Sequence, residues 1–271
     1  MTSGGTDTGT SATTATAAAQ PAAAQPAAAT ERTTEQRRAV LEQIASEVRT
    51  CTRCRLSQTR TRAVPGEGRA DTEVVLVGEG PGQTEDQQGR PFVGRAGDLL
   101  VKLLSTLGWR RQEVFITNIV KCRPPGNRDP EPDEIAACVP YLQRQLEVVD
   151  PAVVVTLGRF SMAHFRPGER ITQIHGTHVA APAETGAPDA VAFAMFHPAA
   201  ALRSTDVERQ SYDDIALLPR VLRESRARRN QDRPAAAPTV AATEVPAAHV
   251  AATEVALVAP AEPLDDAPTL F

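Results

Sequence analysis

One stretch of the chain, residues 74–97, restricts the fold more than any other part of the sequence. It begins with an uninterrupted run of large apolar side chains at 74–77, which is typical of a strand buried on both faces of a parallel sheet. The run stops at a glycine-rich turn with the sequence GEGPG at 78–82, where glycine lets another molecule approach the backbone closely. Ligands of open α/β sheets bind at the carboxyl ends of the strands. The sequence therefore predicts an α/β fold with a binding site at this turn.

Helical and strand patterns alternate along the rest of residues 33–227. Helical spacing of apolar residues predicts helices over 34–48, 95–107, 131–149 and near 160–165, and apolar runs predict further strands at 114–118, 152–158 and 191–196. We expect a hairpin over 171–180 around His175-Gly176, and a closing helix over 207–224 that is kinked or interrupted at Pro219. This alternation indicates a three-layer α/β/α fold around a central, four-stranded, mostly parallel sheet.

The two ends of the chain differ in composition from this middle part. Residues 1–32 consist mostly of Ala, Thr, Gly, Gln and Pro, and residues 228–271 are rich in Ala and Pro and acidic. Neither end carries enough large apolar side chains to offset the entropy cost of folding. We therefore expect one domain at 33–227 between two disordered tails. The tails account for the formal net charge of −4, so the domain is mildly basic, which favours a nucleic-acid partner.

The four cysteines indicate a metal site. No apolar segment approaches the ~20 residues of a membrane span, and no signal peptide is evident, so we expect a cytoplasmic protein in which thiols stay reduced. Cys51 and Cys54 form a Cys-x2-Cys pair, and Cys122 and Cys138 follow at longer spacing. Four thiolates suit either a tetrahedral zinc ion or an iron–sulfur cluster. The spacing alone leaves both open.

Taken together, the motifs resemble those of the family 4 uracil-DNA glycosylases. The matching segments are GEGPG at 78–82, EDxxGxPFVGxAG at 85–97, ITNxxKCRPP at 116–125, Asn127-Arg128, CxPYL at 138–142 and His197-Pro198. The resemblance covers residues 51–215. It implies a base-excision-repair enzyme that hydrolyses the N-glycosidic bond of uracil flipped out of single- or double-stranded DNA. It also implies a 4Fe–4S cluster held by Cys51, Cys54, Cys122 and Cys138.

The resemblance implies three residues that bind the extruded base, and each has a physical reason. The target base must leave the helix to reach a pocket, and Phe92 would stack on its ring. Asn118 offers one acceptor and one donor on a single amide, which matches the N3–H and O4 of uracil and not the edge of cytosine. His197 would donate a hydrogen bond to uracil O2 as negative charge develops there. Each residue could instead have a purely structural role: Phe92 as a core ring, Asn118 as a cap of the strand end, and His197 as a buried structural histidine.

A carboxylate is expected near the sugar, where it would assist the attacking water and stabilise positive charge. Glu79 and Glu85 are both candidates. The better-known glycosylase families place an Asp where Gly80 stands here, so the resemblance does not identify the general base. We favour Glu79 as the residue that fixes the loop or the water, with Glu85 close behind it. Gly80 is expected to turn its backbone towards the base.

Four residues are expected to contact DNA. Arg123 precedes the proline-rich loop at 124–130 and Arg128 lies within it, and both would bind the phosphate backbone. Arg203 ends the HPAAALR segment that starts at His197, and Leu202 within that segment would fill the gap left by the flipped base. A leucine buried in the core is the alternative for Leu202.

Two other functions remain open from the sequence. One is a protein that binds uracil-DNA and traps the abasic product covalently, although PGNRDP stands at 125–130 where such proteins carry a basic, histidine-containing insertion. The other is a nucleotide-dependent enzyme, although the third glycine of a dinucleotide fingerprint is absent. We expect a monomer in the nucleoid. The final Leu270-Phe271 faintly resembles peptides that bind the sliding clamp.

Overall fold

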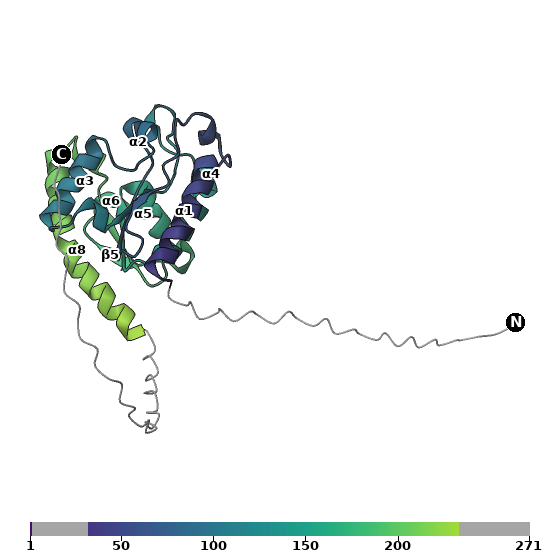
Figure 1. Ribbon diagram of the computed structural model, residues 1–271. Coiled ribbons are helices and arrows are strands. Elements are labelled where there is room, and N and C mark those ends of the chain that lie inside the picture. The colour runs from purple at the N-terminus through teal and green to yellow at the C-terminus, as the bar shows by residue number, and fades with distance from the viewer. Residues whose placement is uncertain (2–31, 233–271) are drawn as a thin grey trace, which may run out of the picture. The chain divides into compact units, whose positions relative to one another are not determined.

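The computed structural model describes Met1 and residues 32–232 (Figure 1). Almost all of both predicted tails, including Leu270-Phe271, therefore lies outside the described residues. The last helix continues to Asp232, beyond the expected domain limit at residue 227. None of the helices in the described part is long and apolar enough to cross a membrane.

The core of the domain is a sheet with the strand order β1-β3-β2-β4-β6-β5. The strands are β1 (Glu67–Gly68), β2 (Val74–Gly78), β3 (Phe115–Asn118), β4 (Val153–Leu157), β5 (His178–Ala180) and β6 (Val191–Met195). The four inner strands pair in parallel, which confirms the predicted four-stranded parallel core. Every residue of these four strands is buried, so their apolar runs were a reliable signal.

The two edge strands are additions to the predicted sheet. β1 pairs antiparallel with β3, and β5 pairs antiparallel with β6. The predicted hairpin over 171–180 is wrong: this segment forms the short helix α6 (Ile171–Ile174) followed by β5, whose partner is β6. Gly176 has a positive φ of 72°, so the glycine does make a turn, but the turn joins a helix to an edge strand.

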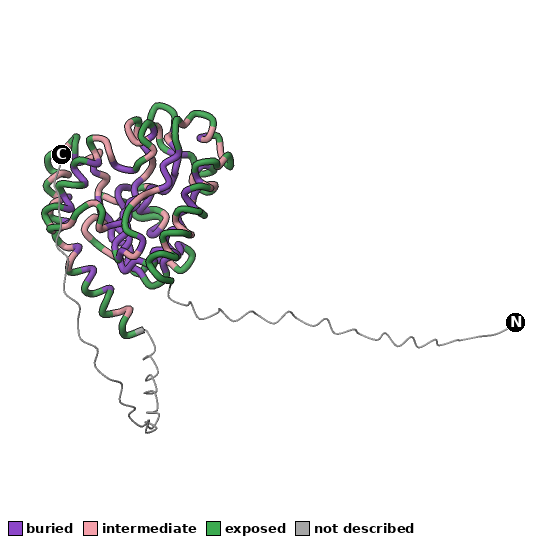
Figure 2. The backbone as a smooth tube through the Cα atoms, viewed as in Figure 1, coloured by how far each residue is buried: buried purple, intermediate pink, exposed green. Residues whose placement is uncertain are grey.

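Helices cover both faces of the sheet, as the three-layer prediction requires. The helices α1 (Thr34–Thr50) and α4 (Pro132–Val149) pack on one face, and α3 (Arg95–Thr106) and α8 (Thr205–Asp232) pack on the other (Figure 1). Consecutive strand residues alternate between the two cores: Val75 and Val77 face the α1–α4 core, and Val74 and Leu76 face the α3–α8 core. In Figure 2 the buried backbone accordingly lies between the helices.

Local signals set the ends of the long helices. Thr33 forms a reciprocal capping box with Gln36 at the start of α1, and Gly108 has a φ of 72° just after α3. α8 continues as one helix through Pro219, so of the two predicted alternatives, a kink or an interruption, the interruption is wrong. A proline removes only one hydrogen bond from the ladder, and the buried Ile215, Leu218 and Val221 hold both halves of the helix against the sheet.

The remaining elements are short and connect the layers. They are α2 (Gln83–Gln88), α5 (Arg159–Phe165), α7 (Pro198–Ala201), and the 3-10 turns at Arg55–Gln58, Arg111–Glu113, Pro125–Asn127 and Ala183–Thr185. Of these, α2, α5 and α7 each begin within five residues of the carboxyl end of a parallel strand. They therefore surround the sheet edge at which a site was expected.

Candidate active site

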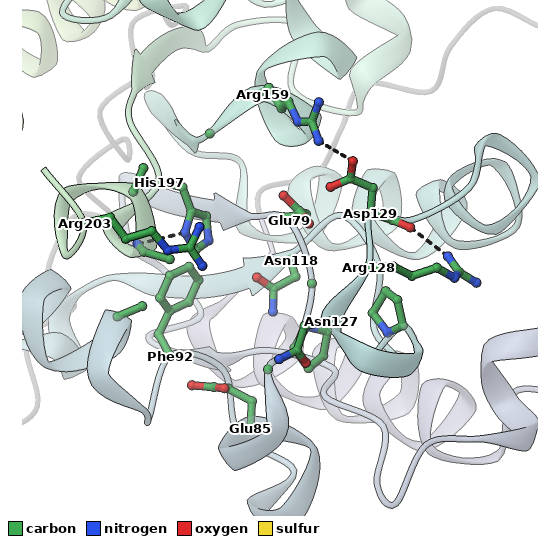
Figure 3. Close-up of a pocket in the computed structure, with 18 of the residues that line it drawn as sticks. Glu79, Glu85, Phe92, Asn118, Asn127, Arg128, Asp129, Arg159, His197 and Arg203 are labelled. Atoms are coloured by element: carbon green, nitrogen blue, oxygen red, sulfur yellow. Dashed lines mark hydrogen bonds and ion pairs between the residues drawn. The ribbon is translucent and has the colours of Figure 1, made fainter. Parts of the chain in front are cut away.

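A pocket of about 500 Å³ opens at the carboxyl ends of the four parallel strands (Figure 3). Glu79 follows β2, Asn118 ends β3, Arg159 follows β4 and His197 follows β6. Most of the predicted site residues line this pocket, namely Glu79, Gly80, Glu85, Phe92, Asn118, Arg128, His197 and Arg203. Arg123 and Leu202 do not line it. Segments distant in sequence thus converge on one cavity, as the strand topology predicts.

Phe92 is held in an uncommon backbone conformation. Its φ is +50°, in the left-handed region that side chains larger than glycine seldom occupy. Two contacts hold this turn in place. Arg111 donates to the Phe92 carbonyl at 2.7 Å. The start of α3 approaches so closely that a Cβ on Gly97 would lie 2.0 Å from the same oxygen. Strain of this kind persists where a side chain must be presented in one orientation.

Glu85 stabilises the same turn. Its Oε1 accepts hydrogen bonds from the backbone N–H groups of Val93 at 2.9 Å and Gly94 at 2.7 Å. The carboxylate of Glu85 therefore binds the backbone of the loop that carries Phe92. Because Glu85 also lines the pocket, its negative charge faces the cavity as well as the turn.

The carboxylate of Glu79 has no hydrogen-bond partner within the described part of the chain and borders the pocket. Burial raises the pKa of Glu79 above its usual range, the nearby charge of Asp129 raises it further, and Arg159 opposes both effects. A carboxylate with a raised pKa, open to a cavity, is typical of a group that handles a proton or a water molecule.

Asn118 lines the pocket and carries a buried acceptor without a partner in the part of the chain that the structure describes. Its side chain is 1% exposed, and its Oδ1 has no hydrogen-bond partner among the described residues. An unsatisfied buried acceptor costs about 1–3 kcal/mol, so it calls for an explanation. Gly78 is required beside it, since a Cβ there would lie 2.4 Å from this oxygen. A ligand with an N–H group in this position would satisfy Asn118.

The protonation of His197 follows from one hydrogen bond. The backbone N–H of Ala199 donates to His197 Nδ1 at 3.1 Å, so Nδ1 is unprotonated and the ring proton resides on Nε2. Burial lowers the pKa of His197 to about 4, with Glu85 opposing and Arg203 reinforcing the shift. His197 is thus a neutral Nε2–H donor near pH 7.

The residues expected at the DNA surface are placed differently from one another. Leu202 is 40% exposed at the end of α7, which excludes the alternative of a core leucine. Arg203 lines the pocket and forms no ion pair with any described residue. Arg123 donates to Asn127 at 2.7 Å. Arg128 is bound through both terminal nitrogens to Glu134, whose side chain is fully buried.

Sequence reasoning missed a second charged group on the pocket wall. Asp129 and Arg159 form an ion pair, and both line the pocket beside Glu79 (Figure 3). Arg159 follows Gly158, whose φ is 90° and whose Cβ, if present, would lie 2.9 Å from that of His197. The position of Arg159 directly after a buried strand was a signal that could have identified it. The pairing with Asp129 had no signal in the sequence.

The four cysteines line a second pocket, next to Lys121 and Tyr141. Backbone or guanidinium N–H groups donate to three of the sulfurs: Arg53 N to Cys51 at 3.5 Å, Arg60 to Cys122 at 3.0 Å, and Lys121 N to Cys138 at 3.2 Å. Burial raises the pKa of Cys138 to about 11, so a thiolate there needs a cationic partner. Among the described residues, no three His, Cys, Asp or Glu side chains are arranged to hold a single metal ion.

Lys121 lies between the two pockets. Its ammonium is fully enclosed and donates to Thr117 Oγ1, Asn118 O and Gln145 Oε1 at 2.6–2.7 Å. Burial lowers the pKa of Lys121 to about 8. The side chain of Lys121 therefore binds the carbonyl of Asn118, and its backbone N–H binds the sulfur of Cys138.

The fold and this pocket agree with the comparisons to known proteins. A family model described as the uracil DNA glycosylase superfamily matches residues 65–217. A type-4 uracil-DNA glycosylase of Sulfurisphaera tokodaii is 48% identical over 65% of this chain and 81% of its own length. Those of Thermotoga maritima and Pyrobaculum aerophilum are 48% and 39% identical, over 53% and 65% of this chain and 76% and 92% of their own lengths. The chain therefore belongs to the uracil-DNA glycosylase superfamily and, within it, to the type-4 uracil-DNA glycosylases.

Proposed function

We propose that this protein is a DNA repair enzyme that hydrolyses the N-glycosidic bond of uracil in DNA, releasing free uracil and leaving an abasic site. The observation that carries this proposal is the unpaired Oδ1 of Asn118 in the same pocket as Phe92 and the Nε2–H donor of His197. Asn118 would accept a hydrogen bond from one extruded pyrimidine, Phe92 would stack on the face of its ring, and His197 would donate to one of its oxygens.

Asn118 selects the base. The N3–H of uracil donates to Oδ1, and the Asn118 amide N–H donates to uracil O4. Cytosine presents an unprotonated N3 and an amino group at the same positions, so both contacts would be mismatched. The hydrogen bond from Lys121 to the Asn118 backbone supports a fixed orientation for this residue, and a fixed amide discriminates better than a mobile one.

His197 and Glu79 act on the scissile bond from opposite sides. As the bond breaks, negative charge moves onto the base, and the Nε2–H of His197 donates to uracil O2 without any change in the charge of the imidazole. The sugar becomes positively charged, and the free carboxylate of Glu79 stabilises it and orients the attacking water. Glu85 instead supports the turn of Phe92 through its bonds to Val93 and Gly94.

DNA contacts surround the mouth of the pocket. Leu202 is exposed and available to enter the gap in the base stack, and Arg203 is free to bind a phosphate. For Arg123 and Arg128 we propose backbone contacts from the same loop, although the ion pair with Glu134 makes Arg128 chiefly a support for that loop. Gly80 lines the pocket and lets the base approach the backbone.

For the four cysteines we propose a 4Fe–4S cluster. Four sulfurs around one pocket, three of them accepting N–H hydrogen bonds, form a donor set that fits such a cluster. When bound, the cluster supplies a rigid cross-link between the end of α1, the loop after β3 and α4. We further propose one folded domain over 33–227, a monomer in the cytoplasm and nucleoid, and contact between Leu270-Phe271 and a sliding clamp.

The test is an assay with oligonucleotides that contain one uracil, as single strands and as duplexes. Free uracil with an alkali-labile strand supports the proposal, and Asn118→Ala is expected to abolish the reaction. A denaturation-resistant adduct would indicate trapping, and no reaction with either substrate would overturn the enzymatic function. A visible absorption band in the purified protein, lost on iron chelation, tests the cluster independently of activity.

A further inference from the structure

The pocket has a second end that the base does not require. Phe92, Asn118 and His197 lie at one side, and Asp129 and Arg159 lie at the other, with Glu79 between them in the view of Figure 3. A nucleotide that enters base-first brings its sugar and flanking phosphates after it. The charged end of the cavity is where those groups would arrive, if the chain acts on DNA as proposed above.

Three arginines line the pocket, and they differ in how firmly they are held. Arg128 is bound through two nitrogens to the fully buried Glu134. Arg203 forms no ion pair within the described residues. Arg159 has one ion-pair partner in the described part of the chain, Asp129, and the two side chains are 60% and 61% exposed. An exposed pair of this kind contributes little to stability, so it can be exchanged for another anion at low cost.

The guanidinium of Arg159 has a second contact besides Asp129. Its guanidinium carbon lies 4.5 Å from the centroid of the Phe160 ring, and its backbone begins α5 directly after Gly158 at the end of β4. Loss of Asp129 would therefore leave the guanidinium beside the pocket. A phosphate oxygen binds a guanidinium through strong, bidentate hydrogen bonds, so a phosphodiester competes well with one exposed carboxylate.

We propose that Arg159 binds a phosphate of the DNA strand beside the extruded nucleotide, and that Asp129 holds Arg159 in the free protein and gives it up when DNA binds. Asp129 then acts against DNA binding, by occupying the group that the phosphate needs. Its removal strengthens binding through Arg159, and in the absence of Arg159 its removal has little effect.

The test measures binding by fluorescence anisotropy. The probe is a labelled single-stranded oligonucleotide with one 2′-fluoro-2′-deoxyuridine, which resists hydrolysis, and sodium chloride is varied. Arg159→Gln should raise Kd roughly three- to tenfold and reduce the slope of log K against log salt by about 0.7, the value for one lost contact to a single strand. Asp129→Asn should lower Kd by up to about fivefold, the most that an exposed ion pair contributes. The double variant should bind like Arg159→Gln alone.

The ion pair of Arg226 with Glu73 provides matched controls. Its side chains are 49% and 47% exposed, and Glu73 precedes the amino end of β2, away from the pocket. Arg226→Gln and Glu73→Gln make the same charge changes and should alter Kd less than the pocket variants do. The inference is wrong if Asp129→Asn matches Glu73→Gln, or if Asp129→Asn strengthens binding equally with and without Arg159. It is also wrong if both pocket variants lower the melting temperature and weaken binding, since the pair would then be a structural clamp. Uracil release by the wild type, measured alongside, separates any of these results from failure of the glycosylase function itself.

Discussion

The rings of Phe92 and His197 stack on each other, with centroids 5.6 Å apart and planes inclined by 30°. Phe92 comes from the strained turn before α3, and His197 from the end of β6, so this contact joins two loops that carry different functions. In the mechanism proposed above, the stack would fix the plane on which the base rests relative to the atom that donates to it. The geometry of the proposed site would therefore depend on two side chains that position each other.

His197→Asn tests the donor at Nε2. Asparagine can still accept the hydrogen bond from Ala199 through its Oδ1, so the fold at α7 should be kept, but it places no donor where Nε2 was. We expect the single-turnover rate of uracil release to fall roughly 10²- to 10³-fold, as for loss of one oxyanion donor, with little change in Kd. A rate within fivefold of the wild type would contradict this role.

The pH dependence of the reaction tests Glu79. Burial raises the pKa of Glu79, so the rate should decline as pH falls through a value above the ordinary carboxyl range. Glu79→Gln should lower the rate by about 10²- to 10⁴-fold and remove this acidic decline. Because a raised pKa means that ionised Glu79 destabilises the fold at neutral pH, the variant should melt no lower than the wild type at pH 7.

Asn118→Leu separates stability from activity. The substitution removes the unpaired Oδ1, and we expect the free energy of unfolding to rise by about 1 kcal/mol while uracil release falls more than about 100-fold. Urea denaturation and the oligonucleotide assay measure the two quantities. Asn118→Asp is the comparison, since a buried carboxylate in the same position should lower stability. Equal destabilisation by both variants would show that Oδ1 is satisfied in the free protein.

Two substitutions of Glu85 distinguish a support for the turn from a catalytic base. Glu85→Gln retains an oxygen that can accept from Val93 and Gly94, and should keep activity within about tenfold of the wild type. Glu85→Ala removes both bonds, releases the turn of Phe92, and should raise KM more than it lowers kcat. A loss with Glu85→Gln as large as that with Glu79→Gln would instead place Glu85 beside the attacking water.

Cys138→Ser tests the metal site. Cys138 is buried and accepts from the backbone of Lys121, so loss of its sulfur should abolish visible absorption and lower the iron content per chain. We also expect a lower melting temperature, because binding of the proposed cluster is coupled to folding of the loops that carry its cysteine ligands. If the Cys138→Ser variant kept the iron content and the melting temperature of the wild type, Cys138 would not be a ligand.

The parallel core and the location of the pocket were predictable because each depends on local sequence. Buried strands appear as continuous apolar runs such as residues 74–77, and parallel topology brings their carboxyl ends together. The edge strands were not predictable. β1 has two residues and β5 has three, too few for any periodicity, and their partners are set by the rest of the sheet.

Eight of the residues predicted for the site line the pocket, but the contacts among the pocket residues were not predictable. The exposed position of Leu202 and the pairing of Arg128 with Glu134 depend on how α7 and α4 pack, which no spacing encodes. The partner of Arg159 lies on another loop, so the charged end of the pocket could not be deduced. The same is true of the tautomer of His197, which depends on the backbone N–H of Ala199.

The four-residue helix α7 has His197 at its beginning and Leu202 at its end. The hydrogen-bond donor and the exposed leucine are therefore carried at the two ends of one short segment. In the proposed mechanism, entry of the leucine into the double helix and contact of the histidine with the base would then depend on the same element. Such a linkage would restrict bond breaking to nucleotides whose place in the stack has already been taken, and would spare bases that open only briefly by thermal motion.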